Sequence, residues 1–213
     1  MRLTLRSSLF LVTLVCAGVA PVAQAAVFVV PIASFAAPQV TFESVALSTP
    51  LNGLTTNGFT FAETSPGTTI VFDSTAGPGN TNNVTGQVGL STDNPAGRLL
   101  TVNLPGLSSA FGFGYASLDT ALPNATTITL FNGSTNVGSL SFASLLDPTF
   151  PGGFAGIGST LPFTRATISF PTSTSAYAVD DFRVTAVPEP GSMLLLGAGL
   201  AGLVLLRARQ ARS

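Results

Sequence analysis

The 213-residue chain has no lysine, no histidine and no tryptophan, and it has one cysteine. Charged residues make up 8% of the chain, whereas an ordinary globular protein has roughly a quarter. Without histidine, Ser-His-Asp and Cys-His nucleophile systems are excluded. Without a second cysteine, disulfides and the usual zinc and redox-metal sites are excluded as well. No set of residues in the sequence identifies a reaction, so we expect a protein that is not an enzyme.

The few charges are unevenly distributed along the chain. Between residues 26 and 186, three arginines stand against eight acidic residues, which gives a net charge of −5. A mildly acidic domain without a basic patch has nothing with which to neutralise phosphates, so we do not expect nucleic-acid binding. The other five arginines lie near the two ends of the chain.

The N-terminal residues have the three parts of a secretory signal peptide. Residues 1–8 carry two arginines, residues 9–19 form an apolar run, and Ala23 and Ala25 are the small residues that signal peptidase accepts. This pattern predicts a signal peptide over residues 1–25, with cleavage after Ala25. The single cysteine, Cys16, lies in the apolar run, so the mature protein would contain no thiol.

The C-terminal residues predict a membrane-inserted tail over residues 187–213. Prolines 188 and 190 stop regular structure that arrives from upstream. The sixteen residues that follow, 191–206, carry no charge. As a helix they would reach about 24 Å, slightly short of a typical hydrocarbon core. Three arginines in residues 207–212 would stay in the cytoplasm, which places the large domain outside.

The order of Pro188-Glu189-Pro190, a short apolar helix and an arginine-rich end resembles the PEP-CTERM sorting signal of Gram-negative bacteria. The resemblance implies that an exosortase, an integral-membrane cysteine transpeptidase, recognises these three residues and cleaves near them. The protein would then be released, or transferred to the cell surface, as a substrate of that enzyme. Members of this family typically come from species that make exopolysaccharide.

Between the two ends, short runs of alternating apolar residues recur between clusters of Gly, Asn, Pro, Ser and Thr. This pattern predicts an all-β protein, a single antiparallel β-sandwich over residues 26–186, and Asn132-Gly133 signals a tight turn. The domain also resembles jelly-roll-type ectodomains of PEP-CTERM proteins in Phe42-Glu43, in Phe111-Gly112-Phe113 and in residues 177–184. We expect strands at residues 40–45, 58–62, 69–72, 86–90, 99–104, 110–117, 126–131, 137–142, 154–157, 165–170 and 176–184.

Three carboxylates are candidates for a structural calcium site, since calcium prefers oxygen ligands. Glu43 lies in an expected early strand, and Asp180 and Asp181 lie in the expected last strand. Jelly rolls often place their terminal strands side by side, so Glu43 and Asp181 could share one ion. Neighbours in a strand face opposite sides, so only one of the two aspartates would point at the ion. The alternatives are exposed charges or ion pairs with Arg165 or Arg183.

The aromatic residues are sixteen phenylalanines and two tyrosines. Most of the phenylalanines fall in expected strands and should form the core. A carbohydrate-binding module with a defined site would instead expose Tyr115 or Tyr177 for stacking on a glycan. Jelly-roll relatives include sugar-binding modules, but a shared fold is weak evidence for a ligand. A glycoside hydrolase would need two acids about 5 to 10 Å apart, and the sequence brings no such pair together.

The sequence therefore predicts an exported protein of the cell surface or extracellular matrix, associated with exopolysaccharide or biofilm. Its expected route is export and cleavage by signal peptidase, retention in the inner membrane by the tail helix, and cleavage by exosortase. Two alternatives stay open: a carbohydrate-binding module, and a membrane protein anchored permanently by an uncut tail.

Overall fold

The computed structural model describes residues 25–64, 69–74, 84–94, 98–117, 121–146 and 150–187. All strand pairs in this part of the chain are antiparallel, and its only helix is the short 3-10 helix η1 (Ile32–Ser34). No helix among these residues is long and apolar enough to cross a membrane. The expected signal sequence up to residue 24 and the expected tail helix lie outside the described residues.

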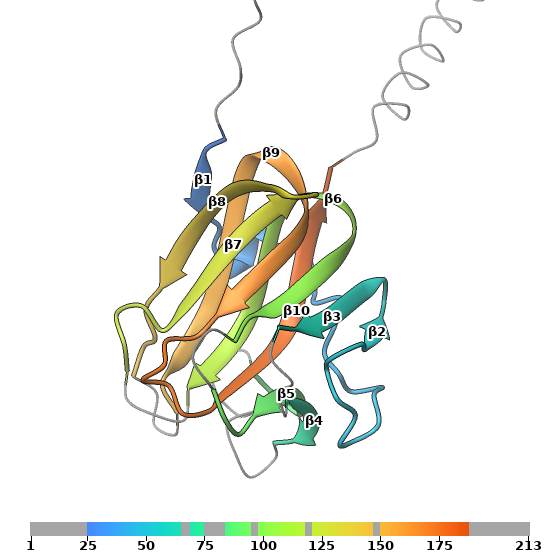
Figure 1. The fold of residues 1–213 in the computed structure, drawn as a ribbon, viewed down its shortest axis with the longest axis vertical. Coiled ribbons are helices and arrows are strands. Elements are labelled where there is room, and N and C mark those ends of the chain that lie inside the picture. The colour runs from blue at the N-terminus through green and yellow to red at the C-terminus, as the bar shows by residue number, and fades with distance from the viewer. Residues whose placement is uncertain are drawn as a thin grey trace, which may run out of the picture.

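The described residues form ten strands, and most of them are short. The exceptions are β6 and β9, which have 18 residues each and run the length of the molecule (Figure 1). The strands are β1 (Val27–Val29), β2 (Thr55–Thr56), β3 (Phe59–Glu63), β4 (Ile70–Asp73), β5 (Gln87–Ser91), β6 (Leu100–Ser117), β7 (Thr126–Asn132), β8 (Thr135–Phe142), β9 (Gly152–Ser169) and β10 (Tyr177–Ala186).

Because β6 and β9 belong to both layers, one continuous sheet folds into a sandwich. The first part of β6 pairs with β3 and with the last part of β9, whereas its second part pairs with β10 and with the first part of β9. Register shifts between residues 103 and 110 of β6 separate the two parts. One layer has the order β4-β5-β10-β6-β9-β1 and the other β2-β3-β6-β9-β7-β8. The predicted antiparallel β-sandwich of jelly-roll type is confirmed.

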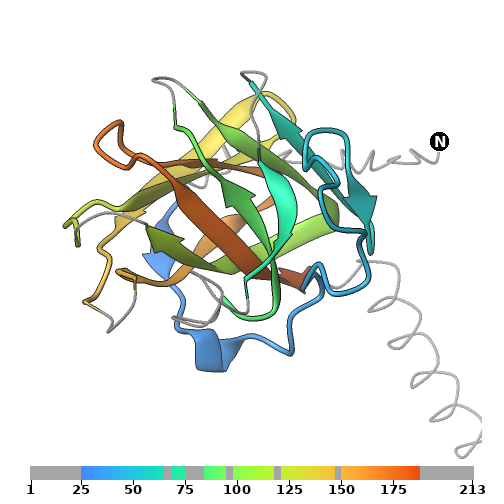
Figure 2. The ribbon, with the colours of Figure 1, turned by 90° about the horizontal axis from the view of Figure 1, so that it is seen from below.

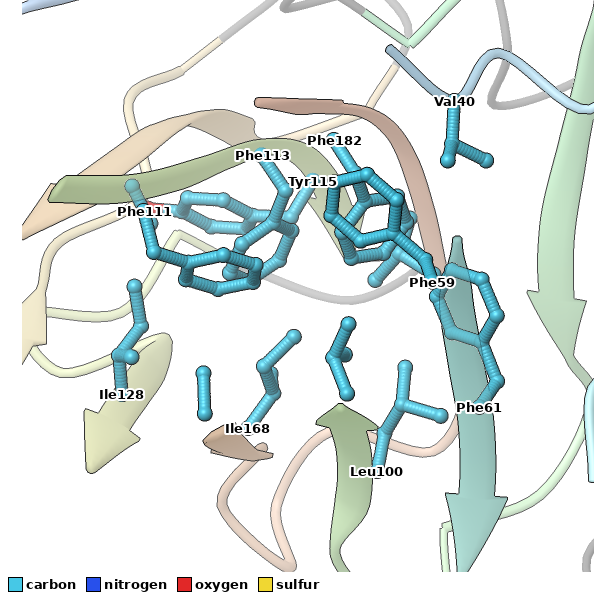
Figure 3. Packing of buried hydrophobic residues seen from close by; sticks show 14 of the residues in the cluster. Val40, Phe59, Phe61, Leu100, Phe111, Phe113, Tyr115, Ile128, Ile168 and Phe182 are labelled. Atoms are coloured by element: carbon cyan, nitrogen blue, oxygen red, sulfur yellow. The ribbon is translucent and has the colours of Figure 1, made fainter. Parts of the chain in front are cut away.

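The core fills the space between the two layers. Aromatic side chains of β6 and β10, among them Phe111, Phe113 and Phe182, face the aliphatic side chains of Leu100, Ile128 and Ile168 (Figure 3). Phe182 lies at the centre of the aromatic group, with its ring 5.5 Å from that of Phe113 in a stacked arrangement. Strand β10, coloured orange-red in Figure 2, lies between β5 and β6.

The predicted strand at residues 40–45 is wrong. Only Val40 makes a bridge, to Phe182, and the chain then turns, with Phe42 at φ +55° and the Val45 amide donating to the Phe42 carbonyl at 2.9 Å. The turn places the Phe42 ring against Phe61 and Phe182. Burial of one aromatic ring therefore outweighs the strand propensity of the segment.

Other strand predictions need smaller corrections. The predicted strands at 99–104 and 110–117 are one strand, β6, and those at 154–157 and 165–170 are one strand, β9. The two long strands pair with each other on both sides of the irregular stretch at residues 104–107 of β6. The short strands β1 and β2 were not predicted. The tight turn is confirmed one residue later than expected, since Asn132 pairs with Thr135 across Gly133 and Ser134.

Candidate functional site

The segment that leads to the predicted sorting motif comes directly from the last strand. Strand β10 ends at Ala186, and the Val187 amide still donates to the Leu107 carbonyl at 2.9 Å. Pro188, Glu189 and Pro190 lie outside the described residues. Neither proline has an N–H group that could donate to a β-ladder. Their role in recognition stays a prediction.

The start of the described chain lies at the same end of the sandwich as its last residues (Figure 1). The Ala26 amide donates to Thr160 Oγ1, and the Thr160 amide donates to the Ala26 carbonyl, both at 3.0 Å. Ala25 is partly buried against the core, and Ala23 lies outside the described residues. Cleavage after Ala25 stays a prediction, and both predicted processing sites flank one end of the domain.

The two tyrosines proposed as glycan contacts do not reach the surface. Tyr115 and Tyr177 are each 1% exposed, so neither offers a face on which a sugar could stack. The Tyr115 hydroxyl donates to the Ala143 carbonyl at 2.8 Å, and the Tyr177 ring stacks on Phe170 with centroids 4.0 Å apart. Burial raises the pKa of Tyr115 to about 12 and also raises the pKa of Tyr177. The glycan-contact prediction for these residues is wrong because they belong to the core.

A β-bulge in β10 begins directly after Asp180 and includes Asp181. Asp181 has φ +55°, and the register with β6 shifts between Asp180 and Arg183. Val179 and Phe182, three residues apart, therefore both enter the core, although strict alternation would separate them by two or four residues. Asp180, just before the bulge, is fully buried. Asp181 pairs with Arg183 at 3.2 Å.

The buried Asp180 and Glu43 each accept a backbone amide from one short segment at the start of β5. Asp180 Oδ2 accepts the Thr85 amide at 3.3 Å, and Glu43 Oε1 accepts the Gln87 amide at 3.0 Å. The residue between these two amides is Gly86, at φ +70°, and a Cβ there would overlap the Glu43 carboxylate. The two carboxylates thus converge on one three-residue segment. We call Glu43, Asp180 and residues 85–87 the paired-carboxylate site.

The two oxygens of Asp180 have different environments. Oδ2 accepts the Thr85 amide, whereas Oδ1 is buried and has no hydrogen-bond partner. Desolvation raises the pKa of Asp180 to about 9; the amides of Asp181 and Thr85 lower it, and the charges of Asp181 and Glu43 raise it. Desolvation also raises the pKa of Asp181, although Arg183 opposes the shift.

The structure corrects the predicted grouping of the three acids. Asp180, not Asp181, lies beside Glu43, and Asp181 forms the ion pair with Arg183 that was the alternative. Arg165 is not part of this site, and its guanidinium lies over the Phe131 ring, 4.6 Å from the centroid. Among the described residues no group of three or more His, Cys, Asp or Glu side chains could hold a metal ion. An ion at this position would therefore bind two carboxylates, with its other ligands from backbone carbonyls or water.

Sequence reasoning missed the contribution of residues 85–87. Thr85 is 95 residues from Asp180 in the chain, and Gln87 is 44 residues from Glu43. Local sequence patterns carry no information about such contacts. The one available signal was Gly86, since glycine often marks a close approach of backbone to another group.

A family model supports the sorting signal. The PEP-CTERM protein-sorting motif matches residues 186–210, beginning at the last residue of β10. No curated protein matches the chain.

Three solved structures show limited likeness to the chain. The enzymatically active domain of tailspike protein 4 from bacteriophage CBA120 is 14% identical, with a TM-score of 0.34, over 64% of this chain and 22% of that chain. A mutant of the family 29 carbohydrate-binding module CBM29-2 is 9% identical, with a TM-score of 0.34, over 68% of this chain and 96% of that chain. The CBM22-1 xylan-binding domain of Paenibacillus barcinonensis Xyn10C is 11% identical, with a TM-score of 0.37, over 71% of this chain and 98% of that chain. All three TM-scores are below 0.5, so the fold description rests on the strand pairing of this chain.

Proposed function

We propose that this PEP-CTERM protein, identified by its residues 186–210, is a non-enzymatic component of an extracellular matrix that contains exopolysaccharide. The motif implies export, processing by exosortase and sorting to the cell surface. The single observation that carries the proposal is the position of this motif directly after the last strand of a folded β-sandwich.

The composition of the domain supports a matrix role. Ser, Thr, Asn and Gly are abundant and charges are few, so the surface would form many weak hydrogen bonds with a neutral polymer. A net charge of −5 between residues 26 and 186 offers little attraction for anionic partners. The absence of histidine and of a mature thiol from the sequence supports a non-enzymatic role.

The proposed route has three steps. Signal peptidase first removes residues 1–25, and the apolar tail then holds the domain at the outer face of the inner membrane. Exosortase finally cleaves near Pro188-Glu189-Pro190 and separates the domain from the tail. Because Val187 is still hydrogen-bonded to the fold, the enzyme would reach the motif right at the surface of the domain.

Intact-mass analysis of the protein from the surface and the medium of exosortase-containing cells tests this route. We expect a mass that begins at Ala26 and ends near the motif. Replacing Pro188, Glu189 and Pro190 by alanine should leave the protein in the membrane with its tail. The matched control is Thr185→Ala, an exposed residue of β10, which should be processed normally.

Two outcomes would contradict the proposal. A wild-type mass that still contains residues 194–213 would show a permanently anchored protein. Correct processing followed by release of the protein without polymer, when the matrix is fractionated, would remove the proposed association with exopolysaccharide.

A further inference from the structure

Asp180 is a buried carboxylate without a counter-charge among the described residues. Its side chain has no exposed surface, and its Oδ1 atom has neither solvent nor a hydrogen-bond partner. Burying an ionised carboxylate is costly unless a counter-charge or hydrogen bonds compensate. Neither of the two ion pairs among the described residues includes Asp180. Either a proton or a cation must therefore supply the missing charge.

The surroundings of Asp180 favour a cation. A second carboxylate, that of Glu43, accepts an amide of the same three-residue segment as Asp180. A proton neutralises one carboxylate and leaves the other beside it, whereas a divalent cation can neutralise both. Glu43 is exposed, so this side of the site is open to an ion from solvent.

We propose that Glu43 and Asp180 bind one calcium ion at the paired-carboxylate site. Carboxylate oxygens are hard ligands that suit calcium, and water can fill the remaining positions of its coordination shell. The described site contains neither imidazole nor thiolate, the ligands that zinc and softer metals prefer. Calcium sites of extracellular modules have dissociation constants of about 0.1 to 1 mM.

Such an ion would join three segments that are distant in the sequence. Glu43 belongs to the turn after Val40, residues 85–87 lead into β5, and Asp180 belongs to β10. The turn is otherwise tied to β10 through the Val40–Phe182 bridge. Calcium binding should therefore stabilise the edge of the sandwich at β4 and β5 against β10. The ion has no part in sorting, so this inference and the proposed function can fail independently.

Calorimetric unfolding of the purified full-length chain in detergent tests the site. With 10 mM CaCl₂ in place of EGTA, ten times a dissociation constant of about 1 mM, we expect the midpoint to rise by about 3 to 6 °C. Isothermal titration with CaCl₂ should give a stoichiometry of one. MgCl₂ should have a smaller effect, because magnesium demands stricter octahedral geometry.

Three variants locate the ion. Asp180→Asn and Glu43→Gln should abolish the response to calcium. In EGTA, Asp180→Asn should unfold at no lower temperature than the wild type, because it removes the buried ionisable group. Asp181→Asn is the matched control: it makes the same change of charge one residue away and should keep the full response.

The proposal is overturned if the wild-type midpoint is the same in CaCl₂ and EGTA and calorimetry detects no binding, which would make Asp180 a protonated buried acid. It is also overturned if Glu43→Gln, a change at an exposed residue that should not prevent folding, responds to calcium like the wild type.

Discussion

Tyr115, a candidate for a surface glycan contact in the sequence, is part of the hydrophobic core. Its ring lies beside Phe113 and Phe170 in the core, and its hydroxyl satisfies the carbonyl of Ala143. Since the unfolded chain would ionise near the ordinary pKa of about 10, the raised pKa of about 12 links this tyrosine to alkaline stability.

The first prediction concerns that linkage. Above pH 10 the unfolded state releases the Tyr115 proton before the folded state does, so the free energy of unfolding falls as pH rises toward 12. Raising the pKa of Tyr115 from 10.0 to about 12 corresponds to about 3 kcal/mol in the free energy of unfolding. Tyr115→Phe should cost about 1 kcal/mol at pH 8 through the lost hydrogen bond and should lose less stability than the wild type between pH 10 and 12. Urea unfolding at each pH measures both effects, and parallel pH curves for the two proteins would contradict the assignment.

Among the elements, the β7–β8 hairpin matches its sequence signal most closely. Gly133, in its turn, has φ +59° and no other group near the position of a Cβ. Replacing Gly133 by a larger residue should therefore cost only backbone strain, because a new Cβ would meet no neighbouring atom.

The second prediction uses this hairpin. Gly133→Ala should lower the free energy of unfolding by about 1 to 2 kcal/mol, because a side chain disfavours the left-handed conformation. Gly106→Ala in β6 is the matched control, since Gly106 also has open space around it but no positive φ. Chemical denaturation should show little change for this control. Equal losses for the two variants would mean that the positive φ of Gly133 does not decide the cost.

Strand β10 shows the limit of local prediction for elements. Its apolar pattern predicts a strand over residues 176–184, and the structure has β10 at Tyr177–Ala186. The bulge at Asp181 was not predictable, because alternation assumes an unbroken ladder. Asp180 keeps the face that alternation from Val179 gives it, and the extra residue at Asp181 returns the chain to the core at Phe182.

At the scale of the whole molecule, the described residues form three hydrophobic clusters. The largest combines side chains from both layers, and two smaller clusters cover the outer face of the layer that contains β10. The last backbone hydrogen bond of the described chain is made by Val187. The domain should therefore not depend on the sorting tail for its stability.

The third prediction follows from this arrangement. A chain that lacks residues 188–213 should leave the membrane and unfold within about 2 °C of the form that cells release after processing, a shift that corresponds to less than about 1 kcal/mol. A chain that lacks residues 177–213 also loses β10 from between β5 and β6, and it should not fold cooperatively. Calorimetry and membrane fractionation measure both properties. A large loss of stability in the first variant would show that the tail takes part in the fold.

The sequence by itself predicted the all-β fold class and, through the sorting motif at residues 186–210, export and sorting to the cell surface. Residue alternation, turn residues, a charge-free apolar run and the prolines of the motif are local patterns, and each has a direct physical reading from neighbouring residues alone. Only the tertiary structure decided the rest. It buried Tyr115 and Tyr177, and it brought Glu43 and Asp180 together over residues 85–87. These results depend on strand register, on one bulge and on contacts between distant segments, because burial of the core selects among pairings that local sequence leaves equivalent.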